Sequence, residues 1–218
     1  MNRQSLDEAI SEIRADTVRM GTQAHDMVEM AVQSIFSESS TLHEEVTLLE
    51  ADLDQSERRA TQKIVELAVT ISPVAHDLLF LTSTLVILGE IERAGDDAYK
   101  LSRRSSKLTM PFPDDLKELL AEMDRQTRFN FRTALSLFAE YDAETADKLI
   151  RSDQLVDNAY KASRRALLEK MVEEPEEKRQ HFRVSEIFHA LEHISDHAVN
   201  IAKTLKLFYE DAVKGTSA

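Results

Sequence analysis

The 218-residue sequence contains no cysteine and only four glycines and four prolines. The absence of cysteine excludes disulfide bonds, thiolate metal sites and thiol catalysis. The scarcity of glycine and proline argues against an all-β or many-stranded α/β fold, because the many turns of such folds need these residues. The composition instead favours good helix formers, namely Ala, Leu, Glu, Lys, Arg and Met, and therefore long helices with few connections.

A membrane-spanning run is also missing. The longest apolar stretch, residues 78–89, is interrupted by Thr82, Ser83 and Thr84. It falls short of the roughly 18 apolar residues that a transmembrane helix needs. The N-terminal segment is charged and has no apolar core behind it, so we expect no secretory signal. The protein is therefore predicted to be cytoplasmic and not to span a membrane.

Acidic side chains outnumber basic ones by 40 to 27, which gives a formal net charge of -13. Such a charge repels phosphate backbones and argues against nucleic-acid binding. Solubility is the simpler interpretation of this acidity, and a cation-binding surface is the more specific one. The sequence has no phosphate-binding loop, no Gly-x-Ser-x-Gly and no His-Glu-x-x-His motif. We therefore expect a regulator or adaptor and not an enzyme.

The prolines divide the chain into long segments with helical periodicity. Each of them should begin or end a helix, because proline lacks an N–H donor and clashes with the preceding turn. These residues are Pro73, Pro111, Pro113 and Pro175. The predicted helices cover residues 5–38, 41–71, 75–108, 114–141, 143–173 and 177–212. Their short connections predict antiparallel neighbours in an all-α fold.

The third and sixth predicted helices carry the same apolar seam, one hundred residues apart. Ile91 lies over Leu191 in this register. The second and fifth predicted helices match at a shift of 101, which places Asp52 over Asp153. An internal duplication explains both matches, so we predict two tandem three-helix bundles, six long helices in all, related by a pseudo-twofold repeat. The predicted domains are residues 1–110 and 111–218.

Acidic residues four positions apart lie on the outer faces of these helices. Asp153 and Asp157 form one pair on the fifth predicted helix. Glu192 and Asp196 form another on the sixth, followed one turn later by Asn200. Like charges at this spacing cost an exposed helix about 0.2–0.5 kcal/mol per pair. If the two helices pack side by side, four carboxylates and an amide oxygen converge as a site for a multivalent cation; solvated acidic faces are the alternative.

Three histidines, His189, His193 and His197, recur every four residues along the sixth predicted helix. Imidazoles beside carboxylates favour Fe, Zn or Mn over Ca or Mg. Surface or interface histidines without a metal are the alternative. The single Glu-x-x-His motif, residues 186–189, resembles one half of a ferritin-like di-iron site, and the sequence has no second half.

The repeat, its spacing and two motifs together resemble the PhoU family. Residues 90–96, Glu-Ile-Glu-Arg-Ala-Gly-Asp, are similar to the first motif of that family. Residues 153–157, Asp-Gln-Leu-Val-Asp, resemble its second-repeat motif, and Met20-Gly21 fits its first helix. The resemblance covers nearly the whole chain and implies a six-helix cytoplasmic regulator of phosphate uptake.

The resemblance also implies multinuclear iron or zinc clusters on both acidic faces, with manganese and magnesium left open. The implied ligands of the first repeat are Asp52, Glu92 and Asp96. Those of the second repeat are Asp153, Asp157, Glu192, Asp196 and Asn200. The first site departs from the family pattern at Ser56, where an acidic residue is expected. The second departs only at residues 193–195, which keeps its carboxylates and makes it the better candidate.

By resemblance, the protein is a negative regulator that couples a phosphate ABC transporter ATPase to a sensor histidine kinase. It keeps uptake and the phosphate-starvation response restrained when phosphate is plentiful. A ferritin-like metal-handling bundle is one alternative. A generic PhoU-like adaptor for another transporter or a stress response is the other. The sequence is compatible with a monomer and with a homodimer.

Overall fold

The computed structural model describes residues 3–37, 40–70 and 74–215 of the chain. These residues form six α-helices and one short 3₁₀ turn. The elements are α1 (Arg3–Phe36), α2 (Ser40–Thr70), α3 (Ala75–Ser105), α4 (Asp114–Ala139), α5 (Ala143–Glu173), η1 (Pro175–Glu177) and α6 (Lys178–Gly215). The predicted helix ends at residues 38 and 71, and the predicted boundary at Pro73, lie outside the described residues.

Several helices begin where the sequence supplies a proline or a cap. α4 follows Pro113, and Pro175 opens η1 ahead of α6. Asp142 caps α5, because its side chain accepts a 2.8 Å hydrogen bond from the backbone N–H of Thr145. α5 therefore starts at the residue that the sequence predicted.

Two predicted helix ends run past the observed ones. α3 ends at Ser105 instead of residue 108, because the backbone N–H groups of Lys107 and Leu108 donate to carbonyls three residues back. That pattern tightens the chain into a 3₁₀-type turn. α4 ends at Ala139 instead of residue 141, because Glu140 has an extended backbone, with φ -143° and ψ 108°.

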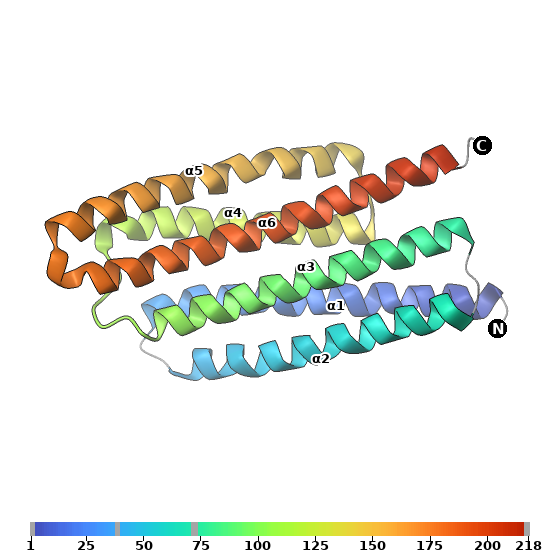
Figure 1. Ribbon diagram of the computed structural model, residues 1–218, viewed down its shortest axis with the longest axis horizontal. Helices are drawn as coiled ribbons and strands as arrows, with labels where there is room; N and C mark the ends of the chain where they lie inside the picture. Colours follow the sequence, from blue (N-terminus) through green and yellow to red (C-terminus); the bar gives the residue numbers. More distant parts are fainter. Residues whose placement is uncertain (1–2, 38–39, 71–73, 216–218) are drawn as a thin grey trace.

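The helices form two stacked antiparallel bundles, α1–α3 and α4–α6 (Figure 1). The bundles meet where α3 packs against α6 and where α1 packs against α4. Ile91 and Leu191, from the two matching seams, are fully buried, and one hydrophobic cluster extends through both bundles. The predicted all-α fold of two tandem three-helix bundles is confirmed. The division at residues 110 and 111 stays a prediction and falls in the link between α3 and α4.

Two glycines mark places where helices approach closely. A Cβ on Gly95 of α3 would overlap Cδ2 of Leu53 on α2. A Cβ on Gly21 of α1 would overlap Cδ2 of Leu135 on α4. Only a residue without a side chain fits such contacts unless the neighbour moves. None of the helices in the described ranges combines the length and apolar character that crossing a membrane requires.

Candidate functional site

The two acidic pairs of the second repeat meet where α5 packs against α6. Burial, and next the charge of Asp196, raise the pKa of Asp153. Burial and Asp196 also raise the pKa of Glu192, and the charge of Asp157 adds to that shift. Burial and neighbouring negative charge therefore disfavour the ionised forms of Asp153 and Glu192. A multivalent cation would relieve this repulsion.

A buried polar network holds Asp153 in place. Its Oδ1 accepts a 3.2 Å hydrogen bond from Ser195 Oγ of α6, which opposes the rise in its pKa. Ser195 Oγ accepts a 3.0 Å bond from Asn130 Nδ2 of α4, and Ser152 Oγ donates to Asn130 Oδ1 over 2.9 Å. Ser195 and Asn130 are fully buried. Neither Asn130 nor Ser152 was predicted from the sequence, although an asparagine on the apolar face of the fourth helix was an available signal.

Asn200, the fifth predicted ligand, does not join the four carboxylates. Its Nδ2 donates a 3.4 Å hydrogen bond to Glu90 Oε2 of α3. α6 therefore turns this amide toward the first repeat and not toward α5. The amide that was predicted to join the four carboxylates points to Glu90 instead. In the described ranges no three of the four carboxylates have ligand atoms within 4.8 Å of one another, and their role as metal ligands stays a prediction.

In the first repeat, Asp52 lies on the side of α2 that faces α1. Its carboxylate accepts a 3.2 Å hydrogen bond from Gln23 Nε2. The structure therefore does not bring Asp52 to Glu92 and Asp96. The reason is the register between the repeats. Gly95 of α3 meets Leu53 of α2, and Ser195 of α6 meets Asp153 of α5, so the residue that corresponds to Asp153 is Leu53, one hundred positions earlier. The sequence comparison had aligned Asp153 with Asp52, at a shift of 101.

Other acids of α2 take the place that was predicted for Asp52. Burial raises the pKa of Glu92, followed by the charges of Asp96 and Asp54. Basic neighbours offset part of this negative charge. Lys100 Nζ lies 3.8 Å from Asp96, and Arg58 donates to Asp54 over 2.8 Å. The second face is also partly offset, because Lys161 donates to Asp157 over 3.1 Å.

Two buried acids of α3 meet a histidine of α6, and their pairing joins the two repeats. Glu90 and Asp97 are each 6% exposed. His197 Nδ1 lies 2.7 Å from Glu90 Oε2, and His197 Nε2 lies 3.4 Å from Asp97 Oδ2. Burial alone would lower the pKa of His197, but the hydrogen bonds to Asp97 and Glu90 outweigh it and raise that pKa. His197 is thus engaged in an ion-paired link between the bundles.

His189 and His193 differ from His197, because they are more open to solvent. One ring nitrogen of each and a carboxylate oxygen of Glu192 all lie within 4.8 Å of one another. The two imidazole rings are 4.0 Å apart, and the ring of Tyr160 on α5 stacks on His189 at 5.7 Å. Burial and the neighbouring His193 lower the pKa of His189. The histidine stripe is thus divided into a more open pair and a member, His197, that is 14% exposed and ion-paired.

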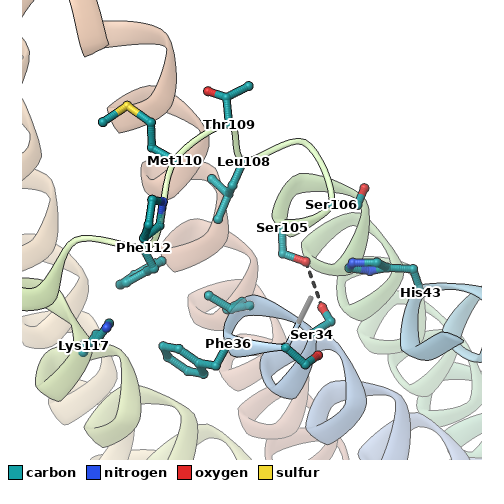
Figure 2. A pocket seen from close by; sticks show the side chains of 13 residues that line it. Ser34, Phe36, His43, Ser105, Ser106, Leu108, Thr109, Met110, Phe112 and Lys117 are labelled. Carbon is teal, nitrogen blue, oxygen red and sulfur yellow. Dashed lines mark hydrogen bonds between the residues drawn. The ribbon is translucent and has the colours of Figure 1, made fainter. Parts of the chain in front are cut away.

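A hollow of about 600 Å³ lies where α1 and α3 end and α4 begins. Figure 2 shows Phe36 and Phe112 on its wall, with ring centroids 6.0 Å apart, and His43 across from them. None of the described residues that line it carries a carboxylate, so it lacks the ligands of a metal site. His43 Nδ1 is 2.7 Å from Ser102 Oγ, but Ser102 is only 2% exposed. This pair therefore links α2 to α3 and does not present a nucleophile.

Comparison with known proteins decides the family. A family model described as the PhoU domain matches residues 17–105 and residues 120–205, with one copy in each bundle. This chain belongs to the PhoU family.

Individual PhoU proteins are similar to the chain over most of its length. It is 29% identical over 202 residues to "Phosphate-specific transport system accessory protein PhoU homolog" of Pseudomonas putida, which covers 92% of this chain and 78% of that protein. The crystal structure of PhoU from Pseudomonas aeruginosa matches with a TM-score of 0.89 at 27% identity, over 94% of this chain and 99% of that one. A PhoU structure from Streptococcus pneumoniae, at 18% identity, has a TM-score of 0.85 over 94% and 96% of the two chains, and supports the fold alone.

The two PhoU copies use equivalent helices for their acidic faces. In the first copy this face lies between α2 and α3, and in the second it lies between α5 and α6. The copies differ in one side chain at this contact, because Asp153 lies against Ser195 in the second copy, whereas Leu53 lies against Gly95 in the first. The candidate functional site of this PhoU protein is therefore the face formed by α5 and α6.

Proposed function

We propose that this protein regulates phosphate uptake as a non-catalytic adaptor in the cytoplasm. It couples a phosphate ABC transporter ATPase to a sensor histidine kinase, and it restrains uptake and the phosphate-starvation response when phosphate is plentiful. The observation that supports this role is the PhoU match in both bundles. Relatives that cover 92% of the chain carry the name of an accessory protein of phosphate-specific transport.

The long helices offer a suitable surface for such partners. The net charge of -13 attracts basic partner surfaces and repels acidic ones. The half-exposed carboxylates between α5 and α6 concentrate part of that charge at one place. A cation bound there would cancel some of it, and so would alter which partner surface can dock.

The second acidic face fits a cation through its oxygen ligands. Our proposed ligands are Asp153, Asp157, Glu192 and Asp196, with iron or zinc as the metals and manganese or magnesium as alternatives. The raised pKa values of Asp153 and Glu192 support this assignment, because burial and the neighbouring carboxylates outweigh the opposing effects of Lys203 and His193. Replacing Asp153 and Glu192 together by Ala should remove metal from the purified protein. An unchanged metal-to-protein ratio would contradict the assignment.

An affinity purification of the tagged full-length protein tests the regulatory role. Source cells are grown in high and in low phosphate, and the recovered partners are identified by mass spectrometry. We expect a phosphate-transporter ATPase or a sensor kinase whose recovery changes with phosphate supply. The Asp157→Asn, Asp196→Asn double variant should alter that change, whereas Glu169→Gln, at an exposed acid of α5, should not.

The same experiment separates the alternatives. Recovery of a different transporter or of stress-response proteins would favour a generic PhoU-like adaptor. Recovery of neither phosphate partner in either condition would contradict the phosphate role and leave the family membership intact.

A ferritin-like role finds less support in the described residues. Such a site needs unpaired carboxylates in the bundle core. The buried acids there are held by basic side chains: Asp124 by Arg128 over 2.9 Å, and Asp97 by Lys100 over 2.9 Å. The acids of the α5–α6 face lie outside the apolar seam.

A further inference from the structure

The more open histidine pair of α6 has its ligand atoms within reach of one ion. Residues 189, 192 and 193 are spaced three and four positions apart, so their side chains project from one side of the helix. One nitrogen of His189, one of His193 and an oxygen of Glu192 all lie within 4.8 Å of one another. Small side-chain rotations bring three such atoms to the metal–ligand distances of about 2.0–2.2 Å that zinc requires.

These side chains are also available to a ligand. His189 is exposed, and its ring packs against the rings of Tyr160 and His193. The stacked ring of Tyr160 limits the rotation of His189. Both histidines line a hollow of about 210 Å³ between α3 and α6, through which an ion can reach them. His197, in contrast, is held by Glu90 and Asp97.

We propose that His189, Glu192 and His193 form a binding site for a transition-metal cation of the Zn²⁺ class. Two imidazole nitrogens and one carboxylate oxygen suit borderline ions such as Zn²⁺, Co²⁺, Ni²⁺ and Cu²⁺, whereas Mg²⁺ and Ca²⁺ prefer oxygen ligands alone. Three protein ligands leave a coordination position for water or for a partner side chain. Glu192 borders the carboxylate face as well, so it lies between an oxygen-rich site and a nitrogen-rich one.

A second trio of similar composition occurs at the start of α6, where Glu174, Glu177 and His181 also lie within 4.8 Å. It has one imidazole instead of two. His181 is 2% exposed, and its Nε2 already pairs with Glu174 at 3.1 Å. Acids at a helix N-terminus are stabilised by the helix dipole without any metal. This trio is therefore a natural comparison for the proposed site.

Zinc titration of the purified, chelator-treated full-length protein tests the proposal. Isothermal titration calorimetry with Zn²⁺ should show one site, and His189→Ala and His193→Ala should each lower its affinity by about 10–100-fold or more. A loss of that size is typical even when only a residue that supports a metal ligand is replaced. His76→Ala, at a histidine whose side chain is 68% exposed, and Glu177→Gln, in the comparison trio, should leave this affinity unchanged. Ring signals assigned to His189 and His193 by NMR should shift on addition of Zn²⁺.

The zinc titration can be distinguished from the tests of the carboxylate face and of the regulatory role. Asp157→Asn should keep the zinc site, because Asp157 lies on α5 and contributes no ligand to it. Zinc affinity that is unchanged in His189→Ala, or that is lost in Glu177→Gln instead, would overturn the proposal. Because the measurement uses purified protein and Zn²⁺ alone, it stands whether or not phosphate partners are recovered from cells.

Discussion

Ser195 of α6 donates a 3.2 Å hydrogen bond to Asp153 of α5, at the position where, one hundred residues earlier, Gly95 of α3 meets Leu53 of α2. The two repeats thus fill the same helix–helix contact with different chemistry. The first repeat has an apolar side chain there, and the second has a carboxylate. This exchange adds a negative charge to the α5–α6 face and explains why that face is the better cation site.

Replacing Ser195 by Ala should destabilise the second bundle. Asp153 loses a donor, and the amide of Asn130, which is fully buried, loses its acceptor. A buried polar group left unsatisfied costs about 1–3 kcal/mol, so we expect the free energy of unfolding to fall by that amount. Urea denaturation measures it. Ser136→Ala, at an exposed serine of α4, is the control and should change stability by less than about 0.5 kcal/mol; equal effects would contradict the network.

Replacing Gly95 and Gly89 by Ala, one at a time, should change stability in opposite directions. The methyl group at Gly95 would overlap Leu53, which is 1% exposed and enclosed by the core. Such overpacking costs about 1–3 kcal/mol and outweighs the gain in helix propensity of about 1 kcal/mol. At Gly89 a Cβ would meet only Arg93 Nη2, at 3.9 Å, so Ala should stabilise by about 0.5–1 kcal/mol.

Urea midpoints measured side by side decide this prediction. A gain in stability for both variants would show that α2 moves aside at no cost. A loss for both would show that Gly89 has a role that its open surroundings do not reveal.

The helices and their duplication were predictable because both depend on local pattern. Prolines and the 3.6-residue period mark where helices begin and which face is apolar. The predicted helix 143–173 matches α5, Ala143–Glu173. Register between helices is a different matter, because an error of one residue turns a side chain by about 100° around the helix. Asp52 was therefore predicted to face α3, whereas the α2 acids near Glu92 are Asp54 and Glu57, and Glu57 lies over Asp157 at a shift of 100.

The link between the bundles could not be predicted for another reason. Glu90 and Asp97 have the pattern of ordinary polar positions on a helix, and His197 lies one hundred residues beyond Asp97. Nothing local indicates that α3 packs against α6. The pairing becomes visible only when both repeats share one core, which is a property of the folded chain.

This buried link should make stability depend on pH. The pKa of His197 is raised above its ordinary value of 6.5, because its bonds to Asp97 and Glu90 outweigh burial. A group whose pKa is raised by folding makes its full contribution to the free energy of unfolding below its unfolded-state pKa. That contribution is lost as pH rises through the folded-state pKa. Burial alone would raise the pKa of Glu90 and Asp97, but His197 and the bases Arg93 and Lys100 lower both. Their contribution is lost as pH falls through those lowered values.

The contribution of the link is therefore greatest between the ordinary values of 4.5 for Glu90 and 6.5 for His197. We expect the difference in free energy of unfolding between wild type and His197→Gln to be larger at about pH 6 than at about pH 9. Urea denaturation in the presence of a chelator measures it. His193 Nδ1 lies 3.5 Å from Asp97 Oδ2, so His193→Gln is measured in parallel. A difference that stays constant across this range would contradict the ion-paired state of His197.

The crowded carboxylates of the α5–α6 face predict two effects of opposite sign in one variant. In the cation-free protein, Asp196→Asn removes the charge that raises the pKa of both Asp153 and Glu192. Relief of like-charge repulsion should stabilise the protein by roughly 0.2–0.5 kcal/mol per pair. With a bound cation the sign reverses, because a ligand that binds only the folded state stabilises it, and the variant has lost a ligand. The rise in Tm on adding Mn²⁺ after chelator treatment should therefore shrink in Asp196→Asn.

A variant that raises stability without the cation and lowers it with the cation has lost a metal ligand, whereas a solvated carboxylate would show neither effect. Glu169→Gln, at an exposed acid of the same bundle, should change neither the Tm in chelator nor its rise with the metal. If Asp196→Asn keeps the full wild-type rise, the four carboxylates do not bind the cation together. If it instead lowers the Tm in chelator, Asp196 stabilises the bundle by itself, and the repulsion inferred from the raised pKa values is offset by a partner. Only a gain without metal, combined with a loss in its presence, fits carboxylates that are crowded in order to hold a cation.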